Sequence, residues 1–107
     1  MENFEQKFQT FLAGATKIYN DYMDANFPNN QKDVLIVLEG KRYKKICMSR
    51  DGGKTAGCAH IFVDKTNGDV LKPASWSAPA KGARGNIFDT SNGLSRITAY
   101  GPEYNRG

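Results

Sequence analysis

The sequence has few of the residues that metal sites and disulfide frameworks need. Its 107 residues include one histidine, His60, and two cysteines, Cys47 and Cys58. These residues lack the paired Cys-x-x-Cys spacing of structural zinc, and small secreted domains built on disulfides usually carry four or more cysteines. We therefore expect no metal site and no cofactor, and we interpret both cysteines as reduced residues of the core.

Long apolar runs are also missing. The longest, at residues 34–38, has the length of one strand, whereas a membrane-spanning helix needs about 20 apolar residues. The N-terminus carries two acids, Glu2 and Glu5, where a secretory signal has a positive region followed by an apolar stretch. We therefore expect a cytoplasmic protein with no membrane association, and a single domain over residues 1–107, because this length suits one core.

Acidic residues are scarce in the second part of the chain. Residues 1–40 hold three basic and six acidic residues, a net charge of −3, whereas residues 41–107 hold twelve and five, a net charge of +7. Between Asp69 and Asp89 there is no acid at all. A local surplus of positive charge commonly marks an anion-binding surface, although a solvated basic face without a ligand would look the same.

The first third of the chain has the pattern of a helix. Apolar residues recur every three or four positions from Phe4 to Met23, which predicts a long amphipathic helix over residues 2–25. The sequence Asn-Phe-Pro-Asn-Asn at 26–30 ends it, since proline disfavours helical backbone in the residue before it. We expect the aromatic stripe of this helix to pack in the core rather than to stack on a ligand.

Short strands are expected after the helix. An apolar run at 33–39 indicates a strand buried on both faces, and residues 42–50 alternate as in a half-exposed strand. Two further strands, at 58–65 and 70–72, flank Asn67-Gly68, a pair favoured in type I′ hairpin turns.

Together these elements predict an α+β fold. The N-terminal amphipathic helix packs on a three- to four-stranded antiparallel meander. A long C-terminal loop region follows, and its residues 72–89 lie against one edge of the sheet. Beyond residue 89 we expect only a short turn near residues 93–100, because the helical signals there are weak.

The loop at residues 72–86 is the first candidate binding site, since a long loop in a small domain tends to be functional. Lys72, Lys81 and Arg84 would hold phosphate groups through charge-assisted hydrogen bonds. Trp76 would stack on a base, and Asn86 would form hydrogen bonds to a polar edge of the ligand. Alternatively, Trp76 closes the edge of the core and the basic residues are merely solvated.

A second basic candidate lies at the start of the second predicted strand. Arg42, Lys44 and Lys45 are three basic residues within four positions, so they would gather at one end of the sheet. They would add positive charge for an anionic ligand.

We predict no catalytic residues. The glycine-rich segment at 51–57 precedes a strand and lacks the spacing of a phosphate-binding loop, which needs a following helix. A catalytic triad would require His60, a serine at 75 or 77 and an acid such as Asp64 to meet. We interpret His60 as a packed or surface strand residue instead.

Residues 62–89 resemble a family of small proteins of unknown activity that tailed bacteriophages and their prophages encode. The resemblance rests on the predicted hairpin, on Trp-x-Ala-Pro-Ala-Lys at 76–81 and on Ala-Arg-Gly-Asn at 83–86. Asn-Gly-Leu at 92–94 and Ala-Tyr-Gly at 99–101 fit the same family, and about half of the chain is covered. The resemblance implies a phage origin and the host cytoplasm, with counter-defence among the possible settings, but it implies no mechanism.

The function we expect is non-enzymatic binding of a phosphate-bearing ligand, either a nucleotide or a nucleotide immune signal. Two alternatives stay open. The first alternative is a nucleic-acid-binding protein. The second is an inhibitor that docks on an acidic host protein through tyrosines such as Tyr43, Tyr100 and Tyr104. The sequence does not indicate the oligomeric state.

Overall fold

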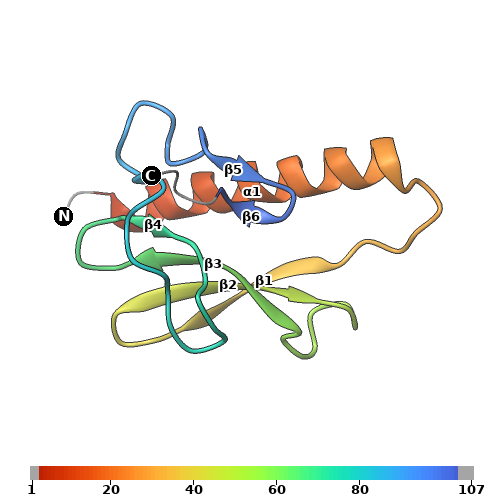
Figure 1. Ribbon diagram of the computed structural model, residues 1–107, viewed down its shortest axis with the longest axis horizontal. Helices are drawn as coiled ribbons and strands as arrows, with labels where there is room; N and C mark the ends of the chain where they lie inside the picture. The colour runs from red at the N-terminus through yellow and green to blue at the C-terminus, as the bar shows by residue number, and fades with distance from the viewer. Residues whose placement is uncertain (1–2, 104–107) are drawn as a thin grey trace.

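One helix lies across a four-stranded antiparallel sheet in the computed structural model, which describes residues 3–103 (Figure 1). The predicted α+β fold is confirmed. Glu2, where we expected the helix to begin, and Tyr104 lie outside the described residues. In chain order, the elements are α1 (Phe4–Asn26), β1 (Val34–Glu39), β2 (Tyr43–Ser49), β3 (Cys58–Asp64), β4 (Val70–Leu71), β5 (Ile97–Thr98) and β6 (Gly101–Pro102).

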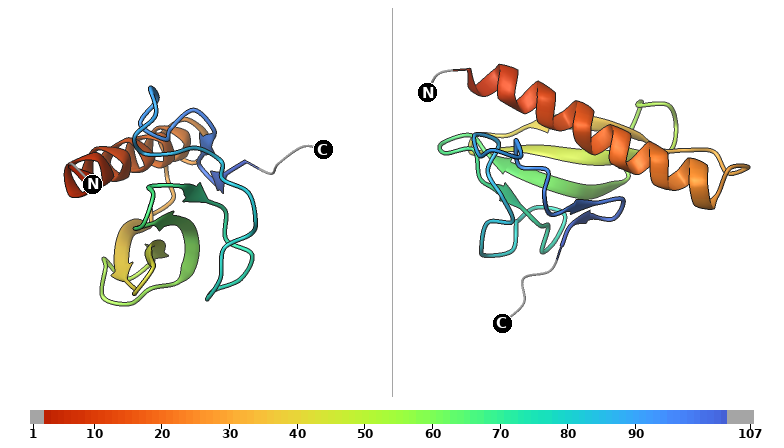
Figure 2. Two further views of the ribbon diagram at one scale, coloured as in Figure 1. Left: turned by 90° about the vertical axis from the view of Figure 1, so that its left-hand side faces the viewer. Right: turned by 90° about the horizontal axis from the view of Figure 1, so that it is seen from above.

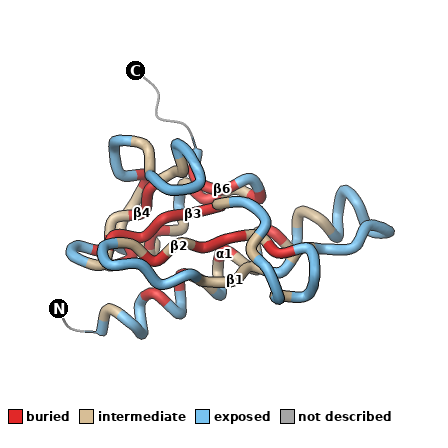
Figure 3. The backbone as a smooth tube through the Cα atoms, turned by 90° about the horizontal axis from the view of Figure 1, so that it is seen from below, coloured by how far each residue is buried: buried red, intermediate tan, exposed pale blue. Residues whose placement is uncertain are grey.

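The core lies between α1 and one face of the sheet (Figure 2). Phe8, Phe11 and Ala15 are fully buried on α1, at the spacing of one helical stripe. They pack against buried residues of β2 and β3, the two long strands in which most residues are buried (Figure 3). This part of the helix stripe therefore belongs to the core, as predicted, whereas Tyr22 and Met23 near its end are only partly buried. Within the described part of the chain, no helix has the length and apolar character needed to cross a bilayer.

The strands follow chain order, β1-β2-β3-β4, and this order corrects two burial predictions. β1 is an edge strand with exposed side chains at Val34 and Leu38, so it is not buried on both faces. β2 lies between β1 and β3 and is mostly buried rather than half exposed. An apolar run identifies a strand, but its position within the sheet depends on partners elsewhere in the chain.

The hairpin between β3 and β4 forms, but its turn is not type I′. A type I′ turn needs positive φ at both central residues, and of the pair only Gly68 has one, at 83°. The connection is longer than a two-residue turn, because residues 64 and 69 close it. Asp64 N–H donates to Asp69 O at 2.9 Å, and Gly68 N–H donates to Asp64 O at 2.7 Å. Asn67 does not adopt a left-handed backbone conformation, and its side-chain oxygen accepts a hydrogen bond from the N–H of Asp69.

The loop after β4 lies against the outer edge of that strand, as predicted. Val70 N–H donates to Gly85 O at 2.9 Å, and Arg84 N–H donates to Val70 O at 2.7 Å. Before this pairing, the chain makes a tight loop closed by a hydrogen bond from Ala74 N–H to Ala78 O at 3.0 Å, with Trp76 at its tip. The sheet edge at β4 is thus covered, and Trp76 is carried away from it.

The C-terminal segment completes the core against the N-terminal helix. Leu94 packs directly on Gly14, and Ile97 of β5 joins the core. The Asn92 side chain donates to Lys7 O at 3.1 Å. Turns form within residues 93–100, as expected, and the chain also forms the β5–β6 hairpin, which the sequence did not predict and which lies beside α1 and β3.

Candidate functional site

Three of the loop residues predicted to bind a ligand hold the loop to its surroundings. The Arg84 side chain is 5% exposed and donates to Lys81 O at 2.9 Å, Gly82 O at 2.7 Å and Glu103 O at 3.1 Å. Lys72 Nζ donates to Pro102 O at 3.1 Å.

Asn86, the third of these residues, lies at the other end of the loop. Its side-chain amide donates to Asn67 O at 2.9 Å and to Asp69 Oδ1 at 3.0 Å, and its Oδ1 accepts the N–H of Phe88. The amide thereby ties the loop to the β3–β4 turn. Lys81, by contrast, is exposed.

Lys44 points to the helix side of the sheet, away from Lys45 and Arg42. Its ammonium pairs with Glu5 at 2.9 Å and Glu39 at 3.0 Å, and lies 4.8 Å from the ring centroid of Phe8. Burial acts to lower the pKa of Lys44, but hydrogen bonds to both carboxylates outweigh it, and the pKa is raised. Lys44 is therefore a buried cation that links α1 to the sheet.

The opposite face of the sheet carries a basic and aromatic cavity, which we call the Trp76 site. Trp76 reaches it from the tight loop at 74–78 and is 46% exposed. Lys45 Nζ lies 3.7 Å from the centroid of the Trp76 ring and donates to Trp76 O at 2.8 Å. The cavity, of about 340 Å³, is lined by Leu38, Glu39, Gly40, Lys41, Arg42, Tyr43, Lys45, Phe62, Trp76 and Ser77.

The charge of the Trp76 site is mainly positive. Lys41 is exposed, and the Arg42 side chain is 62% exposed while Arg42 Nη2 lies 3.1 Å from Asp64 Oδ2. Burial acts to raise the pKa of Asp64, but hydrogen bonds from Thr66 and Arg42 lower it overall. The carboxylate thus stays charged and holds the guanidinium in place. Glu39 is the only acid that lines the cavity within the described part of the chain. Lys65 and Lys44 share its carboxylate, and their hydrogen bonds lower its pKa.

The structure therefore brings together Arg42, Lys45 and Trp76 from the two predicted clusters. The other predicted residues do not line this cavity: Lys44, Lys72, Lys81, Arg84 and Asn86. The sequence reasoning missed Lys41, Tyr43 and Phe62 as lining residues. Lys41 directly precedes Arg42, so the basic run itself was a usable signal, whereas Phe62 enters only through the pairing of β3 with β2 at Lys45.

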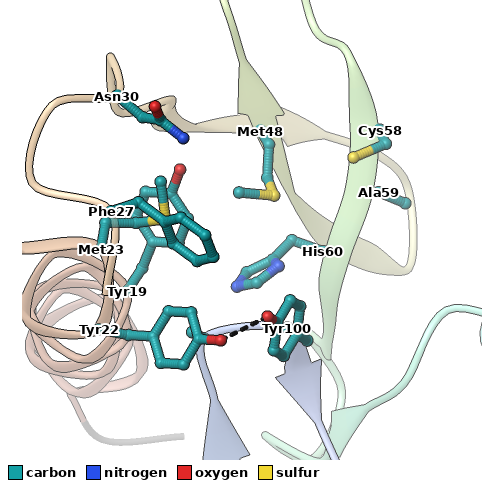
Figure 4. Close-up of a pocket in the computed structure, with 11 residues that line it drawn as sticks. Tyr19, Tyr22, Met23, Phe27, Asn30, Met48, Cys58, Ala59, His60 and Tyr100 are labelled. Atoms are coloured by element: carbon teal, nitrogen blue, oxygen red, sulfur yellow. Dashed lines mark hydrogen bonds between the residues drawn. The ribbon is translucent and has the colours of Figure 1, made fainter. Parts of the chain in front are cut away.

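A second cavity, of about 500 Å³, lies on the helix side of the sheet around His60 (Figure 4). We call it the His60 cavity. His60 is 3% exposed, and its Nε2 has no hydrogen-bond partner among the described residues. Burial, with a smaller contribution from the charge of Lys72, lowers the pKa of His60 to about 4. The cavity is lined by Tyr19, Tyr22, Met23, Phe27, Asn30, Met48, Cys58, Ala59, His60, Ala99 and Tyr100.

The two cysteines differ in exposure, which corrects the prediction that both are core residues. Cys47 is fully buried on β2, whereas Cys58 is exposed at the start of β3, beside the His60 cavity. Both are free thiols. No cluster of three or more histidine, cysteine or acidic side chains within residues 3–103 is arranged to hold a metal ion.

This difference predicts selective thiol chemistry. We expect Ellman's reagent to modify Cys58 in the folded protein, and Cys47 only after denaturation, because burial blocks access and raises the pKa of the Cys47 thiol. Absorbance should report one thiol per chain before denaturant is added and two afterwards. A Cys58→Ser variant should show none before denaturation, and rapid modification of Cys47 in that variant would contradict the prediction.

Comparisons with known proteins identify a family and nothing more specific. A family model described as "Family of unknown function (DUF7717)" matches residues 2–100. Neither the curated proteins nor the solved structures include a match to the chain.

Proposed function

Because the chain belongs to the DUF7717 family, whose function is unknown, we propose its function from the site itself: non-enzymatic binding of a phosphate-bearing ligand at the Trp76 site. One observation carries the proposal. A half-exposed tryptophan is fixed beside three cations, Lys41, Arg42 and Lys45, at one end of the sheet. A flat ring next to positive charge suits a ligand that has both a base and a phosphate.

The position of Trp76 supports a binding role for its ring. A tryptophan that only closed the core would be largely buried, but this one is 46% exposed. Lys45 holds it at two points, through the ring and through the backbone carbonyl. The ring is thereby set in one orientation before a ligand arrives, which reduces the entropy lost on binding.

The cations differ in how firmly they are held. Asp64 holds Arg42 through Nε and Nη2, so the guanidinium is fixed in place and its other edge can donate to a phosphate. Lys41 is exposed and long, so it can follow a phosphate group as the ligand settles. A cavity of about 340 Å³ is at the small end of the usual range for small-molecule sites, about 300–1,000 Å³, which favours one nucleotide over a nucleic-acid strand.

The setting we propose follows from the resemblance of residues 62–89 to phage proteins. In the cytoplasm of an infected cell, a small protein that sequesters a nucleotide immune signal would act in counter-defence without any catalytic group. This biological role is part of the proposal and rests on the same site.

Fluorescence provides a direct test, because Trp76 is the only tryptophan of the chain. We expect a nucleotide that binds to quench Trp76 emission, with an affinity that falls roughly tenfold in Lys41→Ala, as expected for one charge-assisted hydrogen bond. Ribonucleoside triphosphates and cyclic dinucleotides are the compounds to titrate, with calorimetry to confirm the affinities.

Lys17→Ala is the matched control, since it removes the same charge from an exposed position on α1. An equal loss of affinity in Lys17→Ala would show that the loss in Lys41→Ala comes from the overall charge of the protein and not from a contact with the ligand. No quenching by any of the nucleotides would contradict nucleotide binding. A steep fall in affinity for single-stranded DNA with rising salt would instead favour the nucleic-acid alternative, because phosphate-backbone binding releases counterions.

A further inference from the structure

The His60 cavity is separate from the Trp76 site and chemically unlike it. The two cavities share no lining residue and lie on opposite faces of the sheet. Among residues 3–103, no lysine, arginine, aspartate or glutamate lines the His60 cavity, whose wall is mainly aromatic rings and methionine thioethers. A nucleotide phosphate would find no counter-charge there, so a function of this cavity requires another class of ligand.

An irregularity in β3 places His60 on this side of the sheet. Ile46 of β2 pairs with Ile61, but the next residue, Cys47, pairs with Ala59, so His60 is an extra residue in β3. Such bulges commonly redirect a side chain next to a functional site. The imidazole extends from β3 toward the aromatic side chains of α1 (Figure 4).

The β5–β6 hairpin closes over the backbone at His60. Gly101 has a φ of 101°, and a Cβ built there would lie 2.7 Å from His60 O, so the hairpin approaches this closely only with glycine. The neighbouring Tyr100 is 72% exposed, and its hydroxyl lies 2.6 Å from that of Tyr22 on α1. This pair joins the helix to the hairpin at one side of the cavity (Figure 4).

Within this cavity, Nε2 of His60 is a polar group that the described residues leave without a hydrogen bond. It is buried and has no partner among residues 3–103. A buried polar atom without a hydrogen bond costs about 1–3 kcal/mol. A neutral imidazole either donates or accepts at Nε2, depending on its tautomer, and a hydroxyl group serves both cases because it donates and accepts.

We propose that the His60 cavity binds a small, uncharged ring compound bearing a hydroxyl group, with the hydroxyl bonded to His60 Nε2 and the ring held among the aromatic and methionine side chains. A volume of about 500 Å³ accommodates one such molecule. The ligand enters past Tyr100, and parting of the Tyr22–Tyr100 pair opens the route to Nε2. This site works independently of the proposed nucleotide binding.

The test compares 2-naphthol with 2-methylnaphthalene, which has nearly the same size and shape but no hydroxyl. We expect the wild-type protein to bind 2-naphthol about tenfold more tightly, as one buried hydrogen bond allows. Nuclear magnetic resonance should show the largest amide shifts at Ala99, Tyr100 and Gly101. Equal affinity for the two probes, or shifts centred on Trp76, would overturn the proposal.

Two variants sharpen the result. His60→Phe should weaken 2-naphthol binding about tenfold and leave 2-methylnaphthalene unchanged, because only the hydrogen bond is lost. Met23→Trp, on the half-exposed wall of α1, should block both probes by filling the cavity. A thermal melt establishes that each variant is folded. Undiminished 2-naphthol binding in either folded variant would contradict the proposed site.

The thiol at the edge of the cavity gives a readout in the wild-type protein. Bound 2-naphthol should slow the alkylation of Cys58, which lines the cavity, by severalfold at saturation. Cys47, buried elsewhere on β2, serves as the internal reference after denaturation. An unchanged rate at a 2-naphthol concentration that saturates the amide shifts would place the ligand outside this cavity.

Discussion

Replacing Arg84 with alanine is expected to lower the free energy of unfolding by about 3 kcal/mol, because the guanidinium is buried and bonded to three main-chain carbonyls. Its loss leaves the carbonyls of Lys81, Gly82 and Glu103 without this donor and removes the packing of the side chain. Urea denaturation followed by circular dichroism measures the change. The effect on nucleotide affinity should be small, since Arg84 does not line the Trp76 site.

Lys81→Ala is the control for Arg84→Ala, because Lys81 is a nearby but exposed cation of the same loop. We expect its unfolding free energy to stay within about 0.5 kcal/mol of the wild type. A stable Arg84→Ala protein that no longer binds a nucleotide would reverse this interpretation. It would restore Arg84 to the phosphate-binding role that the sequence first indicated.

Acidification from pH 7 to pH 5 is expected to destabilise the protein by about 2 kcal/mol through His60 alone. The folded state holds the His60 pKa at about 4, below its ordinary value of 6.5, so the unfolded chain binds the proton more readily. Stability is therefore fully present above pH 6.5 and is lost as the pH falls toward 4. Urea midpoints measured at intervals of half a pH unit would record the slope.

His60→Phe should remove this dependence between pH 5 and pH 7, because His60 is the only histidine in the chain. The carboxylates with lowered pKa values, such as Asp51 at about 2, contribute below this interval. A variant that kept the wild-type slope would show that another group causes it. Equal stability of the wild type at pH 5 and pH 7 would contradict a buried neutral imidazole.

The helix and the strands could be predicted because their signals are local. The three-to-four spacing of Phe8, Phe11 and Ala15 is a property of one segment, and so are the apolar runs that became β1 and β3. The hairpin turn was wrong in detail because Asp64 and the Asn67 side chain supply hydrogen bonds that a dipeptide preference does not contain. Local patterns thus identify the elements but not their hydrogen bonding.

The candidate sites could be predicted only in part, because they depend on contacts between distant residues. Lys45 and Trp76 are 31 positions apart, and Tyr22 and Tyr100 are 78 apart. The charge surplus identified basic residues but could not separate Arg84, which stabilises the loop, from Arg42, which lines a cavity. The bulge at His60 has no clear local signal, because it arises from the pairing of β2 with β3.

The packing of the C-terminal segment on α1 has a consequence for the order of folding. The apolar stripe of the helix, synthesised first, needs Leu94 and Ile97 to complete its burial. Contacts over such long sequence separations slow folding, since a large loop must close before they form. On the ribosome, β2 and β3 cover part of the helix stripe first, and its burial stays incomplete until residues 92–100 emerge. A chain stalled before that point is the form most exposed to chaperones and to aggregation.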